Sequence, residues 1–187
     1  RGPGAAGTYD LSGTGSLVTG ETVVGLDDGS GYFRQDGGPH TAGAVKVEGV
    51  LSGHDAGYEL LAGTLSAELV EISGGSTVRQ SGGDGSVGRL YVREPLSGEP
   101  MNTYAYTGGS LQVDWLDLRS QLDLGGAAVT VGAQPGSWLD FSRGTITGAS
   151  NAALNTAANS VVVLRGDQEP DGVFGSSDVQ GILHRPG

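Results

Sequence analysis

Two short motifs recur along this chain at nearly constant spacing, and this internal repeat restricts the folds that the sequence can adopt. The first motif reads GTYDLSGTGSL from residue 7, GYELLAGTL from residue 57 and NTYAYTGGSL from residue 102. Tyr58 and Tyr104 of this motif are 46 positions apart. The second reads GYFRQDGG from residue 31, STVRQSGG from residue 76 and, more weakly, SQLDLGG from residue 120, and its Phe33 and Val78 are 45 positions apart. Because two motifs recur in one order and at one period, we conclude that the chain is built from repeats.

The residues between the motifs predict strands. Apolar residues alternate over a few positions before Gly, Ser, Asp or Asn interrupts them, and no segment carries a long helical stripe. Glycine accounts for 36 of 187 residues, which suits tight corners between short strands. A solenoid coil needs roughly 20–25 residues, so each repeat is interpreted as two coils. We therefore expect an all-β parallel β-helix (β-solenoid) of about seven coils at a spacing of ~4.8 Å. A glycine-rich antiparallel sandwich remains the alternative, because short alternating segments suit both folds.

Composition limits the partners. The formal net charge is −11, with Lys46 as the single lysine, so we expect no nucleic-acid partner. We expect a chain this acidic to bind divalent cations rather than nucleic acid. There is no cysteine, and no apolar run approaches the ~20 residues of a membrane span. These features fit a secreted bacterial protein at the cell surface. Since residue 1 is Arg1, the sequence is interpreted as a mature product, a fragment or a sequence read without its start.

The two motifs resemble a repeat of large secreted and surface-exposed bacterial proteins that are related to autotransporter passenger strands. The matching residues are Tyr9, Leu11, Gly13, Phe33, Gln35, Gly37, Gly38, Tyr58, Leu60, Gly63, Leu65, Gln80, Gly82 and Gly83. The third copy departs from the pattern because it loses the Gln-x-Gly-Gly ending. The resemblance covers about residues 5–165 and implies a right-handed parallel β-helix. We accordingly assign residues 1–165 to a β-solenoid repeat domain and residues 166–187 to a separate C-terminal segment.

The C-terminal segment contains a calcium-loop pattern. Asp167, Glu169 and Asp171 alternate, Gly172 follows, and Asp178 comes after five further residues. Calcium prefers six to eight oxygen ligands, which a curling chain supplies from alternate residues. The predicted metal ligands are Asp167, Glu169, Asp171, the backbone carbonyl of Val173, and Asp178, with Gly175 acting through water. An acidic turn that binds no metal is the alternative.

This segment is similar to one half of a dockerin-type module. The likeness rests on GDQEPDGVFGSSDVQGIL, from residue 166 to residue 183. It implies a single calcium loop of the EF-hand type. Ser176 or Ser177 is expected to cap a short following helix that contains Val179, Ile182 and Leu183. The segment departs from the dockerin pattern at Glu169, Pro170 and Gly175, and it carries one loop where dockerins carry two.

No catalytic constellation is evident, and we predict that the chain is not an enzyme. His40, His54 and His184 lack metal-ligand spacing and are expected at the surface. Gly-x-Ser-x-Gly patterns lack the strand–turn–helix context of a hydrolase. Asp114, Asp117 and Asp123 surround Trp115 and could form a sugar-cleaving site, although a solvated strand face explains them better.

The leading hypothesis for the function is an extracellular structural protein. Such a surface or filament subunit would assemble head to tail with other copies, with calcium supporting the junction. The first alternative is a glycan-binding adhesin that uses Trp115, Trp138 and the arginines Arg34, Arg79 and Arg119 on one face. A polysaccharide lyase or hydrolase on a β-helix is the second alternative, which the single lysine disfavours.

Overall fold

The computed structural model describes residues 6–25, 29–49, 56–125, 129–130, 136–147, 154–155, 160–163 and 181–184, and every regular element in these ranges is a strand. The strands are β1 (Ala6–Gly13), β2 (Leu17–Val24), β3 (Ser30–Glu48), β4 (Ala56–Ser73), β5 (Thr77–Gln80), β6 (Asp84–Val92), β7 (Thr103–Tyr106), β8 (Ser110–Leu118), β9 (Gln121–Leu124), β10 (Val129–Thr130), β11 (Trp138–Asp140), β12 (Thr145–Thr147), β13 (Leu154–Asn155), β14 (Ser160–Val163) and β15 (Gly181–His184).

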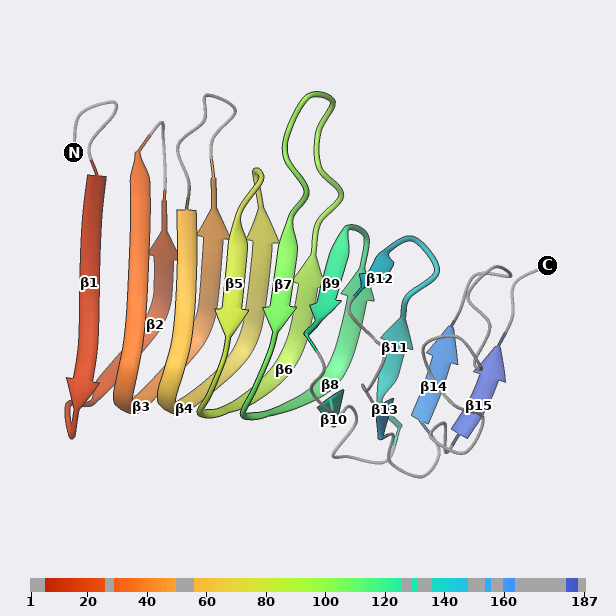
Figure 1. Cartoon of the computed structure of the whole chain (residues 1–187). Coiled ribbons are helices and arrows are strands. Elements are labelled where there is room, and N and C mark those ends of the chain that lie inside the picture. The colour runs from red at the N-terminus through yellow and green to blue at the C-terminus, as the bar shows by residue number, and fades with distance from the viewer. Residues whose placement is uncertain are drawn as a thin grey trace.

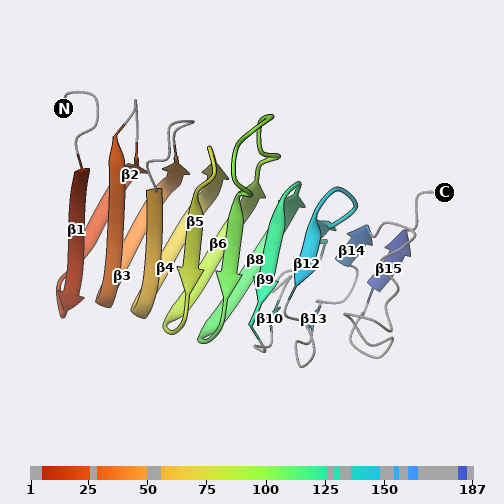
Figure 2. The same cartoon turned by 45° about the horizontal axis from the view of Figure 1, so that its top comes forward.

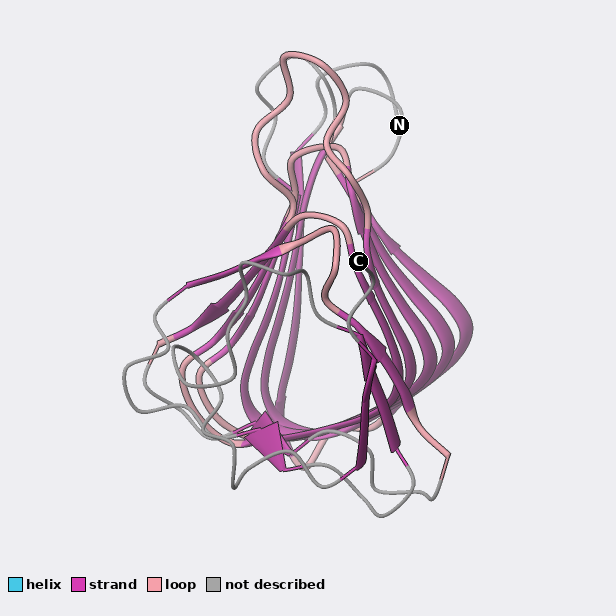
Figure 3. Cartoon of the chain, turned by 90° about the vertical axis from the view of Figure 1, so that its right-hand side faces the viewer, coloured by secondary structure: helices cyan, strands magenta, loops and turns pink. Residues whose placement is uncertain are grey.

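The strands pair in parallel and stack as a β-solenoid (Figure 1). The first row consists of β1, residues 30–36 of β3, residues 56–62 of β4, β5, β7, β9 and β12. The second row consists of β2, residues 39–48 of β3, residues 64–73 of β4, β6, β8, β11, β14 and β15. Successive coils lie side by side (Figure 2) around one interior (Figure 3). The predicted β-solenoid is therefore confirmed, and the parallel pairing excludes the antiparallel sandwich.

The interpretation of each repeat as two coils is also confirmed. Along the first row, Tyr9 pairs with Phe33, Phe33 with Tyr58, Tyr58 with Val78, and Val78 with Tyr104. The two motifs thus alternate from coil to coil at one position of the stack. The handedness and the count of seven coils stay predictions, as does the boundary between residues 165 and 166.

The predicted C-terminal helical turn is wrong at its end. Gly181–His184, which include Ile182 and Leu183, form strand β15 and pair with β14. The apolar residues there suit a helix and a buried strand equally well in so short a segment, so pairing with β14 decides between them.

Apolar side chains from both rows fill the interior. The largest fully buried ones are Tyr58, Tyr104, Tyr106, Phe141, Leu60, Ile72, Leu90, Leu111, Leu118, Leu124 and Leu139. Each such side chain contributes roughly 1.5–3 kcal/mol by leaving water. In the absence of cysteine, this continuous apolar core holds the described coils together.

The second row bends at one residue per coil. Pairing skips Gly20, Gly43, Glu68, Gly88 and Asp114 in turn, while the residues on both sides of each stay in register. The alternation of inward and outward side chains therefore breaks at the bend. On β8 the buried Val113 and Leu116 enclose two consecutive outward residues, Asp114 and Trp115.

Candidate functional site

A buried glutamine closes the corner between the two rows in two of the described coils, those of Gln35 and Gln80. The Gln35 side chain donates to the carbonyl of Gly38 in its own coil (2.8 Å) and to that of Thr64 in the next coil (3.0 Å). Gln80 makes the same two bonds to Gly83 (3.3 Å) and Ser110 (2.7 Å). Each glutamine thus ties its own corner to the corner of the next coil, which gives the glutamine of the Gln-x-Gly-Gly motif a structural role here.

The tyrosine of the other motif completes this network. Tyr58 donates its hydroxyl hydrogen to Oε1 of Gln35 (2.6 Å), and Tyr104 donates to Oε1 of Gln80 (2.8 Å). Both tyrosines are buried, which raises the pKa of each hydroxyl and keeps it protonated as a donor. Each tyrosine reaches back to the coil that precedes it. The ~45-residue period of the sequence is therefore a period of glutamine coils and tyrosine coils.

In the two coils after that of Tyr104, apolar residues replace both partners. Leu124 continues the ladder of Gln80 and Tyr106, and Ile146 continues the ladder of Tyr104 and Leu122. An apolar residue thus stands at the glutamine position, and the next coil has an apolar residue at the tyrosine position. Replacing both members of a buried hydrogen bond avoids an orphaned polar group, which is the costly case.

The prediction that His40 lies at the surface is wrong. Its ring is fully buried, stacks on Phe33 with centroids 5.1 Å apart, and hydrogen bonds to Tyr58 and Thr22. Because Tyr58 donates to Gln35, His40 donates to Tyr58 through Nδ1 and accepts from Thr22 at Nε2. Burial lowers the pKa of His40, which keeps the ring neutral. His54 lies outside the described residues, and His184 is placed only as part of the β15 backbone.

Among the described residues, the N-terminal end of the stack is an unpaired strand edge whose residues resemble those of the interior coils. All eight residues of β1 pair with β3, and within the described residues no strand pairs with the opposite side of β1. Tyr9 stacks on Phe33 (centroids 5.0 Å) and Phe33 stacks on Tyr58 (4.7 Å). The exposed fraction of Tyr9 is 49%, against 1% for Tyr58 at the same position two coils later. An apolar ladder thus ends in an open aromatic ring.

Glycines line the corner where successive coils meet. At Gly38, Gly63, Gly83 and Gly109, an added Cβ would lie 1.8–2.7 Å from the backbone carbonyl oxygen of the glycine one coil earlier, so a side chain would push the coils apart. Gly13, in the first coil, has the left-handed φ of 62° but no atom within 4 Å of its missing Cβ. The first coil therefore leaves this corner clear.

The outer face of the second row carries a paired charge ladder. Arg93 pairs with Glu71 of the adjacent strand, and Arg119 holds Asp117 through three hydrogen bonds of 2.8, 3.0 and 3.1 Å. Both guanidinium groups lie over Tyr91, at 5.5 and 5.2 Å from its ring centroid. The Arg93–Glu71 pair and the Arg119–Tyr91 contact join neighbouring coils, and each is worth ~0.5–1 kcal/mol at a partly exposed site.

The carboxylates predicted as a sugar-cleaving alternative do not gather. Asp117 is buried against Arg119 on the second row, while Asp123 lies on β9 of the first row and accepts from Thr147 (3.2 Å). Asp114 lies at the bend of β8. The expectation of a solvated face is wrong for Asp117, which is buried and paired with Arg119. The sequence pattern does not indicate this pairing.

The predicted glycan-binding face is partly wrong. Trp115 and Trp138 pair across β8 and β11 and are exposed by 37% and 41%, and Arg89 precedes them in the same ladder with its guanidinium 5.7 Å from the Trp115 ring. Arg119 flanks this surface at the end of β8. Arg34 and Arg79, however, lie on the first row, in the ladder with Glu59.

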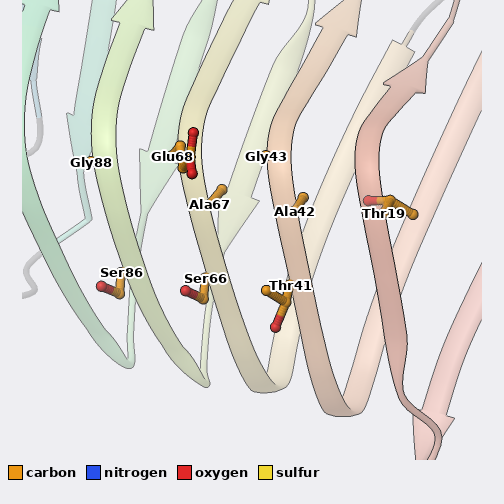
Figure 4. A pocket seen from close by; sticks show the side chains of 9 residues that line it. All are labelled: Thr19, Thr41, Ala42, Gly43, Ser66, Ala67, Glu68, Ser86 and Gly88. Carbon is orange, nitrogen blue, oxygen red and sulfur yellow. The ribbon is translucent and has the colours of Figure 1, made fainter.

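A groove of about 360 Å³ runs along the bend of the second row (Figure 4). It is lined by Thr19, Thr41, Ala42, Gly43, Ser66, Ala67, Glu68, Ser86 and Gly88. The hydroxyls of Thr41, Ser66 and Ser86 follow one another on adjacent coils. Glu68 is the one ionisable side chain of the lining, so the groove has polar contacts to offer but no acid–base pair.

The predicted calcium ligands Asp167, Glu169, Asp171, Val173 and Asp178 lie outside the described residues. Within the described ranges, no group of three or more His, Asp or Glu side chains is placed to hold a metal ion. The calcium site therefore stays a prediction from the sequence.

Comparison with known proteins gives no relative. No family model, no curated protein and no solved structure matches the chain. In the part of the chain that the structure describes, there is no helix of the length and apolarity needed to span a membrane.

Proposed function

We propose that this protein is an extracellular structural subunit, a β-solenoid that extends by stacking end to end with other copies. The observation that carries the proposal is the open Tyr9 ring at the end of the aromatic ladder. An end coil that faced water alone would gain from polar residues on its outer side, as terminal repeats of solenoids do. Here β1 instead resembles the internal coils, and unpaired strand edges add further strands readily.

Calcium has a supporting place in this proposal. The acidic residues from Asp167 to Asp178 would bind one ion and stiffen the junction between neighbouring subunits. A chain of net charge −11 repels its own copies, and a bound divalent cation reduces that repulsion. The extracellular setting rests on the acidic composition, the absence of cysteine and the resemblance of the repeat to bacterial surface proteins.

The Gly13→Ala variant is expected to weaken end-to-end assembly. Its Cβ has free space within the subunit, yet it occupies the corner that an incoming coil would need. A backbone clash of this kind costs ~1–3 kcal/mol, so assembly should require a concentration about tenfold higher. Sedimentation velocity and negative-stain electron microscopy, in millimolar calcium and in chelator, would measure this, and the assemblies should come apart in chelator.

The matched control is Gly98→Ala. Gly98 also has a positive φ (89°) and no atom within 4 Å of its missing Cβ, but it lies in the turn between β6 and β7, away from the end of the stack. It therefore reproduces the backbone strain without touching the edge. A wild-type chain that stays monomeric at high concentration with calcium present would refute the proposal.

A second candidate function is binding of an uncharged polysaccharide. It is favoured by the two neighbouring exposed tryptophans and by Arg89, which has no ion pair among the described residues. Exposed aromatic rings present flat apolar surfaces, and arginine offers several hydrogen-bond donors to hydroxyl oxygens. Glu68, Asp114 and Asp140 on the same face disfavour an acidic polymer.

Removing both indole rings should abolish such binding. In native gel electrophoresis through hydroxyethyl cellulose, galactomannan or laminarin, the wild-type chain should be retarded and the Trp115→Ala/Trp138→Ala variant should lose at least about tenfold in affinity. Leu96→Ala, which trims an exposed apolar side chain on a distant loop, serves as the control. Equal migration of the wild-type chain with and without every polymer would remove this candidate.

A further inference from the structure

The N-terminal edge of the stack lies at a defined position in the two-coil period, and this position indicates which kind of coil would fit against it. Tyr9, Phe33, Tyr58, Val78 and Tyr104 occupy one ladder on five successive coils. Tyrosine coils and glutamine coils alternate along it. The first described coil is therefore a tyrosine coil, and its tyrosine lies at the open end.

In both complete pairs the tyrosine hydroxyl bonds to the coil on its N-terminal side. Tyr58 reaches Gln35 and Tyr104 reaches Gln80, at 2.6 and 2.8 Å. Each glutamine lies one coil earlier and two residues further along its strand than the residue that pairs with the tyrosine. By the same geometry, the acceptor for Tyr9 belongs to a coil that would lie on the open side of β1.

We infer that the N-terminal face is a docking site for one kind of partner, a parallel β-solenoid coil that carries the Gln-x-Gly-Gly corner. Its glutamine Oε1 would accept from the Tyr9 hydroxyl, and its strand would pair with the free edge of β1. This inference rests on the proposed function, since it requires that this end accepts a further coil. It adds the chemical identity of that coil.

A coil with leucine at the glutamine position fits this face less well. Such a coil exists in the chain, where Leu124 follows Tyr106 in the ladder of Gln80, and the next coil there offers Ile146 rather than a tyrosine. Stacked on Tyr9, a leucine coil would bury a hydroxyl without an acceptor, which is the costly outcome for a polar group. Gly13 and Gly15 keep the corner clear of side chains, which suits the close approach of an incoming coil.

The test extends the full chain by one coil. A second copy of residues 26–49, the coil that contains Gln35, is joined ahead of Arg1, so that residues 1–5 take the place that residues 50–55 have between β3 and β4. The extension is made with its glutamine and with Gln→Leu at that position, each in the wild-type and the Tyr9→Phe background. The four chains form a double-mutant cycle that isolates the glutamine–tyrosine pair from other effects of the leucine.

Thermal unfolding and amide hydrogen exchange of β1 are the readouts. With Tyr9 present, the glutamine extension should melt about 2–4 °C above the leucine extension, as expected for one buried hydrogen bond in a chain of this size. In the Tyr9→Phe background, which lacks the hydroxyl donor, that excess should disappear. Both extensions should slow exchange of the β1 amides relative to the unextended chain.

The outcomes separate the two proposals. If both extensions protect β1 equally and the melting difference does not depend on Tyr9, the inference about glutamine is wrong while the end still accepts coils. If neither extension protects β1, stacking at this end fails and both proposals fall. If the unextended chain already protects β1 at high concentration, and Tyr9→Phe leaves that protection unchanged, the end of a second copy occupies the face without a glutamine, which also overturns the inference.

Discussion

The Gly38→Ala variant is expected to lose about 3–5 kcal/mol of unfolding free energy, a large part of the stability of an ordinary domain. Gly38 has a φ of 64°, and an added Cβ would lie 1.8 Å from the carbonyl oxygen of Gly15 in the preceding coil. The backbone itself would have to move, because no flexible side chain is present to give way. Equilibrium denaturation in urea measures the loss.

Gly13→Ala is the matched control for this substitution. Gly13 has nearly the same φ, 62°, but no atom lies within 4 Å of its missing Cβ. Measured at concentrations below those of assembly, the control therefore reports the cost of the left-handed backbone alone, which is about 1–2 kcal/mol. The difference between the two variants measures how tightly the coils stack at the corner. Equal losses would show that backbone conformation, rather than contact between coils, selects glycine at Gly38.

Replacing Gln80 by leucine should cost about 2–4 kcal/mol of unfolding free energy. The leucine has a similar size, so the loss comes from hydrogen bonds. Tyr104 would keep a buried hydroxyl without its acceptor, and the carbonyl of Ser110 would lose its side-chain donor. Urea denaturation at neutral pH measures the effect, and Gln112→Leu on the exposed side of β8 should change stability by less than ~0.5 kcal/mol.

The double variant Gln80→Leu/Tyr104→Phe sharpens this prediction. Because both polar partners are then absent, it should be more stable than Gln80→Leu alone, as in the later coils where Leu124 and Ile146 stand at these positions. A double variant that loses the sum of the two single effects would contradict a direct glutamine–tyrosine bond.

The sequence was sufficient to predict the architecture, because the period of two motifs is a direct record of how coils stack. A repeat of ~45 residues is about twice the length of one coil, which suggested two coils per repeat, and the pairing of Tyr58 with Val78 of the other motif agrees with this. It was not sufficient to predict the pairing of Tyr58 with Gln35, since that bond depends on which residues face inward on adjacent coils. The burial of His40 follows from the same network, and a lone histidine after a glycine pair gives no local sign of it.

The outer surface was predicted less well for two physical reasons. Coil length varies: Tyr104 pairs with Leu122, 18 residues later, whereas Thr77 pairs with Thr103, 26 residues later. Sequence distance therefore does not tell which arginines share a face, and Arg79 falls on the opposite row from Trp115. The bend also breaks the alternation of inward and outward side chains, so a pattern counted from one side of the bend assigns the wrong face on the other side.

The alternation of glutamine and tyrosine coils has a consequence for how such a stack can change in length. Duplicating or deleting a single coil would set two tyrosine coils or two glutamine coils against each other and leave a buried hydroxyl or a corner amide oxygen without its match. A unit of two coils preserves every pair. Insertion into the alternating part of the stack without loss of stability is therefore quantised, in increments of about 9.5 Å, twice the spacing of neighbouring strands.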